Sequence, residues 1–214
     1  MRKLIAGIHR FQKQYWSANQ ELYRRLAEHG QFPEALFITC SDSRVAPLTI
    51  THGQPGDLFI VRNIGNFVPP SSEEPLDDSG VAAAVEYAVE HLEVRDIIVC
   101  GHSDCGAMKA LYRERAEFAA TPHIARWLRH GDRTMAVVAA NYPELSREER
   151  FEITAEENVL LQMENLRTYP VVKKATQAGR LHLHAWYHVI GTGTIFRYSP
   201  EKEQFEPIRE EEAR

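Results

Sequence analysis

Two short apolar runs in this chain each lead directly into residues that can bind a metal ion. The run ALFIT is followed by Cys40, and the run DIIVCG is followed by His102, with Cys105 shortly after it. Runs of this length and composition are typical of buried strands in a parallel sheet. Ligands of such sheets bind outside the carboxyl ends of the strands, so we expect these three side chains to lie close together.

The three residue types point to zinc. Thiolate and imidazole are ligands that zinc prefers in a tetrahedral site, and a catalytic zinc site typically has three protein ligands and leaves the fourth position to water. Cys40, His102 and Cys105 would supply three ligands. Asp42 and Arg44 lie in the same CSDSR stretch as Cys40, so a carboxylate and a guanidinium are expected beside the metal.

Length and composition limit the class of protein. The chain has 214 residues, of which 43% are apolar, and this favours a single domain over residues 1–214. A formal charge of -5 gives no basic surface for nucleic acid. No apolar run approaches the roughly 18 residues of a membrane span, and the beginning turns polar too soon for a secretory signal. We therefore expect a cytoplasmic protein, free or within a microcompartment, with no nucleic-acid or membrane partner.

The first part of the chain carries an amphipathic pattern. Apolar side chains recur at helical spacing over residues 2–28, which predicts one or two helices ahead of the first strand. These helices could lie across a partner subunit as an arm of about residues 1–28, or they could pack on the core of their own chain. The sequence leaves both interpretations open.

A β-α-β unit follows. After the strand DLFIVRN, a helix capped by Asp78 or Ser79 is the clearest in the chain, because its apolar residues repeat at intervals of three and four. The strand DIIVC comes next, so the unit predicts parallel strands joined by a right-handed crossover. Further helices are expected at about 106–120, 123–140 and 147–167, and Ser146 with Glu149 predicts a capping box at the start of the last one.

The end of the chain alternates in polarity. The stretch RLHLHAWYHVIGTGTIFRYS turns at GTG and predicts a hairpin at one edge of the sheet. Its histidines, His182, His184 and His188, have no cysteine or carboxylate at ligand spacing, so we interpret them as surface or core residues. The predicted fold class is α/β: a central, mostly parallel sheet flanked by helices, with an N-terminal helical arm and a C-terminal edge hairpin.

The motifs resemble those of a known family. CSDSR and GHSDCG are similar to the signature of the β-class carbonic anhydrases, and GDLFIVRNIGNFVPP, VAAAVEYAV and DIIVCGHSDCGAMKAL follow that family in order and spacing. The likeness covers roughly residues 30–112. It implies reversible hydration of CO2 to bicarbonate and a proton through a zinc-bound hydroxide, with one zinc ion per chain. It also implies a homodimer or a larger assembly of dimers, with the active site near the subunit boundary.

The resemblance also implies roles for the polar residues. Cys40, His102 and Cys105 would be the zinc ligands, with Asp42 and Arg44 as the catalytic pair. Asp42 would orient the zinc hydroxide toward CO2 while Arg44 holds its carboxylate by a two-pronged ion pair. Asp42 could instead leave Arg44 and become a fourth ligand that closes the site, and the plain alternative is an ion pair that only stabilises the loop.

Two residues distinguish branches of the family. Gln31 matches a glutamine that lines the substrate pocket in the plant-like branch, which favours the open site. Phe37 stands where the bicarbonate-inhibited branch has a tryptophan, so regulation by a second bicarbonate is not expected.

A small apolar pocket is a further implication of the resemblance. Phe59, Ile64 and Tyr87 would wall it, and Gly106 would allow close approach beside Cys105. Apolar residues in strands and helices usually belong to the core, so a purely structural role stays open for these three. His52 and Asp104 lie near the motifs and could relay protons, but the sequence does not identify the shuttle.

Three rival functions fit part of the pattern. Cys100 could complete a closed set of four ligands in a structural-zinc scaffold protein, although it lies in an apolar strand where a free thiol behaves as a small hydrophobe. Cys40 and Arg44 could act as nucleophile and anion clamp of a phosphatase, although Asp42 would repel a phosphate. Relatives of the resembled family hydrolyse carbon disulfide or carbonyl sulfide, and the motifs do not exclude those substrates.

Overall fold

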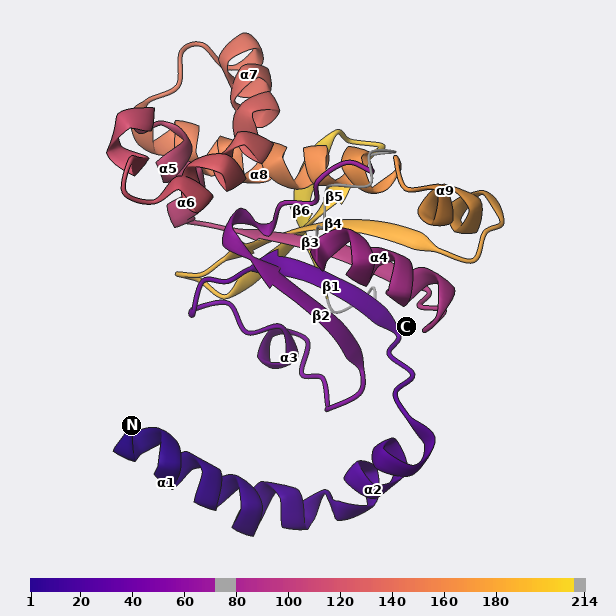
Figure 1. Cartoon of the computed structure of the whole chain (residues 1–214). Helices are drawn as coiled ribbons and strands as arrows, with labels where there is room; N and C mark the ends of the chain where they lie inside the picture. Colours follow the sequence, from indigo (N-terminus) through magenta and orange to yellow (C-terminus); the bar gives the residue numbers. More distant parts are fainter. Residues whose placement is uncertain (72–79, 210–214) are drawn as a thin grey trace.

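The computed structural model describes residues 1–71 and 80–209. Within these ranges six strands form one sheet in the order β2-β1-β3-β4-β5-β6 (Figure 1). The first four in that order are parallel, and the last two continue the sheet antiparallel. The predicted mostly parallel α/β sheet is therefore confirmed. The strands are β1 (Ala35–Cys40), β2 (Leu58–Asn63), β3 (Asp96–His102), β4 (His182–Val189), β5 (Thr194–Ser199) and β6 (Gln204–Pro207).

Three helices cover one face of the sheet: α4 (Gly80–Glu90), α8 (Arg147–Leu166) and α9 (Pro170–Gln177). Their apolar residues join those of β1, β3 and β4 in the main core cluster. Side chains alternate between the two faces of a strand, so the intervening residues of β1 and β3 form a separate small cluster on the other face. That cluster contains Ala35, Phe37, Ile98 and Cys100, with Leu58 and Trp186 packed against it.

The ends of two predicted helices can be compared with the structure. The capping box at the start of α8 is confirmed, because Ser146 Oγ accepts from the Glu149 amide at 3.3 Å and Glu149 Oε2 accepts from the Ser146 amide at 3.0 Å. The predicted cap of α4 at Asp78 or Ser79 lies outside the described residues.

The helix expected at 106–120 is wrong because the chain interrupts it, whereas the stretch expected at 123–140 is helical with a 3-10 segment in its middle. The helix expected at 106–120 ends as α5 (Gly106–Leu111), and a new turn, η3 (Arg115–Phe118), begins at a capping box between Glu114 and Glu117. The helix expected at 123–140 is divided into α6 (Pro122–Trp127), η4 (Leu128–Gly131) and α7 (Asp132–Asn141). Gly131 packs closely against α5, since a Cβ at this position would lie 2.6 Å from Leu111 Cδ2. Short turns, α3 (Pro47–Ile50) and η2 (Ile64–Asn66), follow β1 and β2.

The C-terminal hairpin is confirmed as β4 and β5, which pair antiparallel across the GTG turn. The strand β6, which pairs with β5, was not predicted. It covers only Gln204–Pro207, which is too short for an alternating pattern to be recognised.

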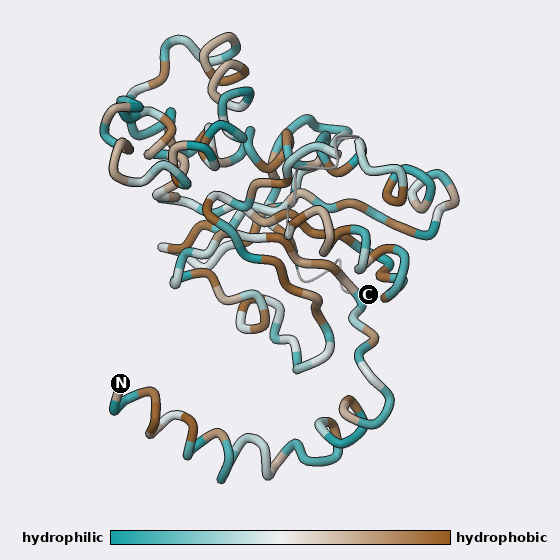
Figure 2. Tube along the Cα trace, viewed as in Figure 1, coloured by the Kyte–Doolittle hydropathy of each residue, from teal (hydrophilic) through white to brown (hydrophobic). Residues whose placement is uncertain are grey.

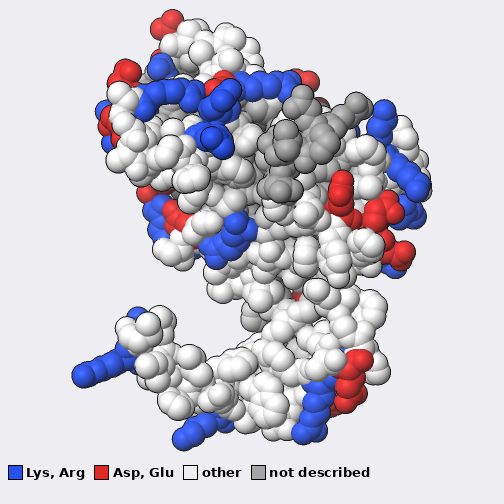
Figure 3. All heavy atoms as spheres, in the orientation of Figure 1, with Lys and Arg blue, Asp and Glu red and all other residues white. Residues whose placement is uncertain are grey.

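The N-terminal helices do not pack on the core of their own chain. α1 (Arg2–Arg10), the π-helix η1 (Phe11–Trp16) and α2 (Gln20–His29) contain no buried residue. Figure 1 shows them extending away from the sheet, and Figure 2 shows hydrophobic positions along them. Their exposed apolar side chains are Leu4, Ile5, Ile8, Phe11, Tyr15 and Trp16. The side of this segment that faces the rest of the molecule is mostly uncharged (Figure 3).

The helices of the described part of the chain were compared with the requirements of a membrane span. None of the helices there combines the length and the apolar character that a span needs.

A carboxyl group in α8 makes the stability depend on pH. Burial, and then the charges of Glu152 and Glu157, raise the pKa of Glu156 from 4.5 to about 7. The folded chain therefore keeps a proton that the unfolded chain releases, and the free energy of unfolding falls as pH rises from 4.5 to about 7. The amide of Glu156→Gln does not titrate, so this variant should not lose stability in the same pH range. We expect it to raise the free energy of unfolding near neutral and alkaline pH by about 1 kcal/mol, discounted for partial exposure.

Urea denaturation of wild type and Glu156→Gln at several pH values checks this prediction. The variant should show a flatter pH profile between the two pKa values. Glu90→Gln removes the same charge from an exposed position of α4. In this variant the free energy of unfolding should change with pH as it does in the wild type. A wild-type slope in Glu156→Gln would contradict the prediction.

Candidate metal centre

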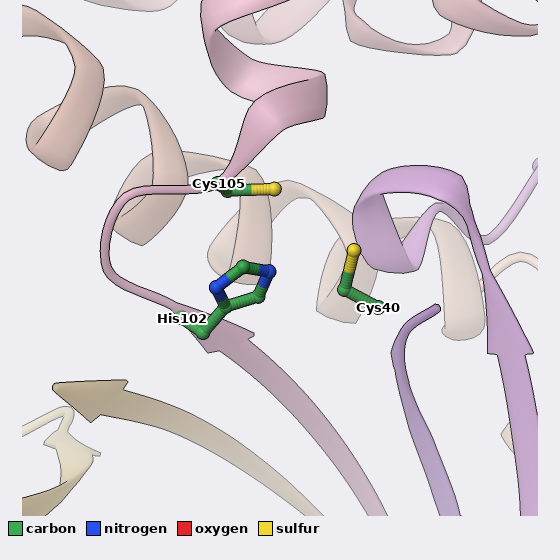
Figure 4. Close-up of side chains that lie close together, drawn as sticks. All are labelled: Cys40, His102 and Cys105. Carbon is green, nitrogen blue, oxygen red and sulfur yellow. The ribbon is translucent and has the colours of Figure 1, made fainter. Parts of the chain in front are cut away.

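The structure brings Cys40, His102 and Cys105 together at the carboxyl edge of the sheet (Figure 4). Cys40 ends β1, His102 ends β3, and Cys105 directly precedes α5. Because β1 and β3 are parallel neighbours, the ligands at their ends meet although the segments are far apart in sequence. Their ligand atoms all lie within 4.8 Å of one another, and all three residues are buried.

The imidazole of His102 has one nitrogen engaged and one free. Nδ1 lies 2.8 Å from the Ser103 carbonyl, while the buried Nε2 has no hydrogen-bond partner of suitable geometry among the described residues. A metal-ligating histidine usually donates its other N–H to such a carbonyl, which fixes the ring and its tautomer. The orientation of His102 is therefore that of a ligand through Nε2.

The loop that carries His102 and Cys105 is held by the strand beside it. The Ser103 amide donates to the His188 carbonyl at 2.9 Å, and Ser103 Oγ accepts from the Ile190 amide at 2.9 Å. Both partners lie at the end of β4, next to the turn of the hairpin. The hairpin thus supports the position of His102.

Electrostatics show that the two thiols cannot both ionise freely. The hydrogen bond from Cys105 lowers the pKa of Cys40 well below its usual range, with a further contribution from His102. The same contact with Cys40, together with burial, raises the pKa of Cys105 well above its usual range. Two neighbouring thiolates repel each other unless a cation lies between them. The donor set of two sulfurs and one imidazole fits zinc, which would hold both thiols deprotonated.

The imidazole responds to the same neighbours. Burial alone would lower the pKa of His102, but the Cys40 sulfur and the Ser103 carbonyl raise it by more than burial lowers it. The ring therefore lies in a region of negative potential, which also favours a cation.

Asp42 and Arg44 form a two-pronged ion pair beside these ligands. Arg44 Nε donates to Asp42 Oδ1 at 2.9 Å, and Nη2 donates to Oδ2 at 2.8 Å. The Arg44 amide also donates to Oδ1, at 2.9 Å. These bonds hold the pKa of Asp42 well below its usual range. The carboxylate stays ionised and is not one of the groups that converge as metal ligands in the described residues.

Arg62 is a site residue that no motif of the sequence singles out. From β2 it donates to the Cys40 carbonyl at 3.2 Å and to the Asp42 carbonyl at 2.6 Å. It thereby fixes the backbone on which a ligand and a catalytic candidate lie. The available signal was a lone arginine near the end of the apolar strand LFIVRN.

The predicted pocket residues are partly grouped. Phe59 on β2 and Tyr87 on α4 lie with ring centroids 5.9 Å apart, and Phe59 also packs against the main core cluster. Ile64 is half-exposed, and its carbonyl accepts from Trp127 Nε1 at 2.7 Å. Gln31 is exposed between α2 and β1. A Cβ added at Gly106, the first residue of α5, would meet no atom within 4 Å.

Other candidate residues lie elsewhere. Cys100 is fully buried in the small cluster on the far face of the sheet, where burial raises its pKa to about 12. It is not in the group of described residues that could bind a metal, nor are the tail histidines. His182 is exposed, His184 pairs with Asp96 at 2.7 Å, and His188 is buried.

The two proton-relay candidates have different surroundings. His52 is exposed at the turn that follows α3. Asp104, by contrast, contacts Arg44 directly, with Arg44 Nη1 donating to Asp104 Oδ2 at 2.8 Å. Only Asp104 is thus joined to the catalytic candidates.

Comparisons with known proteins agree on one family. A family described as carbonic anhydrase matches residues 35–195. A carbonic anhydrase of Synechocystis sp. is 42% identical over 92% of this chain and 71% of its own length. The solved β-carbonic anhydrase CcaA superposes with a TM-score of 0.91 at 41% identity, covering 97% of this chain and 99% of that one. Tetrameric β-carbonic anhydrases of Sordaria macrospora reach a TM-score of 0.81 at 30% identity, covering 92% of this chain and 95% of theirs.

Proposed function

The chain belongs to the β-class carbonic anhydrases, and from this premise we propose that Cys40, His102 and Cys105 hold its zinc ion. The activity is the reversible hydration of CO2 to bicarbonate and a proton, with zinc as the cofactor. Asp42 and Arg44 are the catalytic pair in this proposal. The observation that carries it is the convergence of three buried ligand atoms within 4.8 Å of one another, beside an ionised Asp42.

The protein residues orient the reactants. Zinc, when bound, supplies the nucleophile by lowering the pKa of a coordinated water, less strongly with two thiolate ligands than with three neutral histidines. Asp42 is ionised, so it can only accept a hydrogen bond from the attacking water and thereby directs a lone pair toward the carbon of CO2. The fork of Arg44 prevents the carboxylate from turning.

The proposed site includes a small apolar pocket that binds CO2. Phe59, Ile64 and Tyr87 form an apolar wall for CO2, and the Gln31 amide donates to a substrate oxygen. The open space beside Gly106 supports this arrangement, as do the half-exposed side chains of Ile64 and Tyr87. The relatives carry the name carbonic anhydrase, which favours CO2 over carbon disulfide or carbonyl sulfide and an enzyme over a zinc scaffold.

We also propose an assembly and a location. Residues 1–214 form one domain, whose segment of about residues 1–28 lies as an arm across a partner subunit in a homodimer or a larger assembly of dimers. The exposed apolar side chains of α1 and η1 support this interpretation, and the related enzymes of Sordaria macrospora are tetrameric. The location is the cytoplasm, free or within a microcompartment.

CO2 hydration tests the proposed function. Zinc-quantified protein, assayed by stopped flow with a pH indicator, should show activity that rises from about pH 6.5 to 9 as the nucleophile forms. Protein stripped by a chelator should be inactive, and zinc should restore it. Background activity at the alkaline end with one zinc per chain would overturn the proposal.

A further inference from the structure

Arg44 is held from two sides, and the second partner is Asp104. We propose that Asp104 is a positioning residue that fixes the Arg44 guanidinium and, through it, the Asp42 carboxylate. The inference rests on the proposed function of Asp42 and Arg44 and adds a residue to their arrangement.

The guanidinium joins the two loops of the metal centre. Its Nε and Nη2 atoms donate to Asp42, in the loop after β1. Its Nη1 donates to Asp104 Oδ2 at 2.8 Å, and Nη2 also donates to the Asp104 carbonyl at 3.1 Å, in the loop after β3. Arginine presents its donors in a rigid plane, so fixing one edge of the guanidinium sets the direction of the other.

Arg44 needs this second partner because it is not enclosed. Its side chain is 43% exposed. A long, half-exposed side chain loses much rotamer freedom when it is held in one geometry, and a single ion pair in contact with solvent opposes that loss only weakly. Contacts at both edges of the guanidinium restrict it more than either contact alone.

Asp104 is itself anchored. Its second carboxylate oxygen, Oδ1, pairs with Lys109 Nζ, and its amide donates to Glu152 Oε1 at 3.0 Å. The other oxygen of Glu152 accepts from the Tyr187 hydroxyl. Asp104 has a φ of 56°, a left-handed conformation that non-glycine residues adopt less readily. The contacts on both sides of the residue stabilise this conformation and aim its carboxylate at Arg44.

An ordinary surface pair elsewhere in the chain gives the matched comparison. Arg115 and Asp132 also form an ion pair, at 2.7 Å, and the Asp132 side chain is 48% exposed against 52% for Asp104. Simple surface pairs contribute little to stability. If Asp104 and Arg44 formed only such a pair, replacing Asp104 should affect activity no more than replacing Asp132.

Kinetics of zinc-quantified Asp104→Ala, Asp104→Asn and Asp132→Asn test the proposal. We expect Asp104→Ala to lower kcat about tenfold with little change in KM, because Asp42 is misdirected rather than lost. Asp104→Asn keeps one acceptor for Nη1 and should be intermediate, whereas Asp132→Asn should match the wild type. In an Asp42→Asn background, Asp104→Ala should have almost no further effect, because the two residues act in one chain of contacts.

The order of the Arg44 side chain can also be measured directly, without an activity assay. Hydrogen exchange of the Arg44 Nε–H, measured by NMR on the zinc-loaded protein, should be faster in Asp104→Ala and unchanged in Asp132→Asn. The proposal is overturned if Asp104→Ala behaves like Asp132→Asn, or if it lowers kcat by the same factor in the Asp42→Asn background. A zinc-loaded wild type without hydration activity would instead overturn the proposed function, and this inference with it.

Discussion

Replacing Cys40 with serine should remove zinc from the protein and lower CO2 hydration at least about a thousandfold. A serine hydroxyl is a much weaker zinc ligand than a thiolate, so only two good ligands, His102 and Cys105, would remain. Zinc per chain after dialysis, and stopped-flow hydration with added zinc, measure the two effects. Loss of a ligand should also leave the Cys105 thiol without the neighbour that raises its pKa.

Cys100→Ser is the matched control, since it makes the same chemical change outside the site. Cys100 is fully buried on the far face of the sheet and donates to the Gly101 carbonyl at 3.4 Å, a bond that a hydroxyl can keep. We expect full zinc content, near-normal activity and a loss of stability of about 1 kcal/mol from the added polarity. If Cys100→Ser also lost zinc, Cys100 would be a ligand and the site a closed structural one.

Replacing Asp42 with asparagine should lower kcat at least about a hundredfold while zinc stays bound. The amide has nearly the same shape, but it is neutral and carries donors where the reaction needs an acceptor. It also removes the ionic part of the pair with Arg44. Because the pKa of Asp42 is held well below its usual range, the wild-type carboxylate should stay ionised throughout the assay, and no loss from its protonation is expected above about pH 5.

Zinc content decides the meaning of this result. Retained zinc with low activity would agree with Asp42 acting on the attacking water. Loss of zinc in Asp42→Asn would contradict the proposal, because it would make Asp42 a ligand. Arg44→Lys should be intermediate, since an ammonium supplies a charge but not the two-pronged geometry.

The sequence predicted features that depend on local patterns. The strands that end at Cys40 and His102 are short apolar runs, and the β-α-β unit of β2, α4 and β3 predicts a parallel sheet. Cys40 and His102 could therefore be expected at the same edge of that sheet. The cap at Ser146 was equally local. The division of the helix expected at 123–140 was not predictable in this way, because Gly131 packs closely against Leu111, which lies in a separate segment.

The residues that support the site are harder to predict from the sequence. Arg62 acts through two backbone carbonyls, one at the end of β1 and one in the loop after it, and Glu152 acts through the amide of Asp104, so neither has a motif of its own. Phe59 and Tyr87 illustrate a further limit. Their rings contact each other, as two core residues would, and the pattern of one chain cannot distinguish a pocket wall from a core.

The placement of the ligands on separate strands has a consequence for folding. Cys40 and His102 become neighbours only when β1 and β3 have paired, and the loop that carries His102 is held by β4, which comes near the end of the chain. A complete site should therefore appear late in folding, after long-range pairings have closed. Zinc that binds only the finished sheet shifts the folding equilibrium by mass action, so the cell's supply of the metal would also set the fraction of chains in which the sheet is formed.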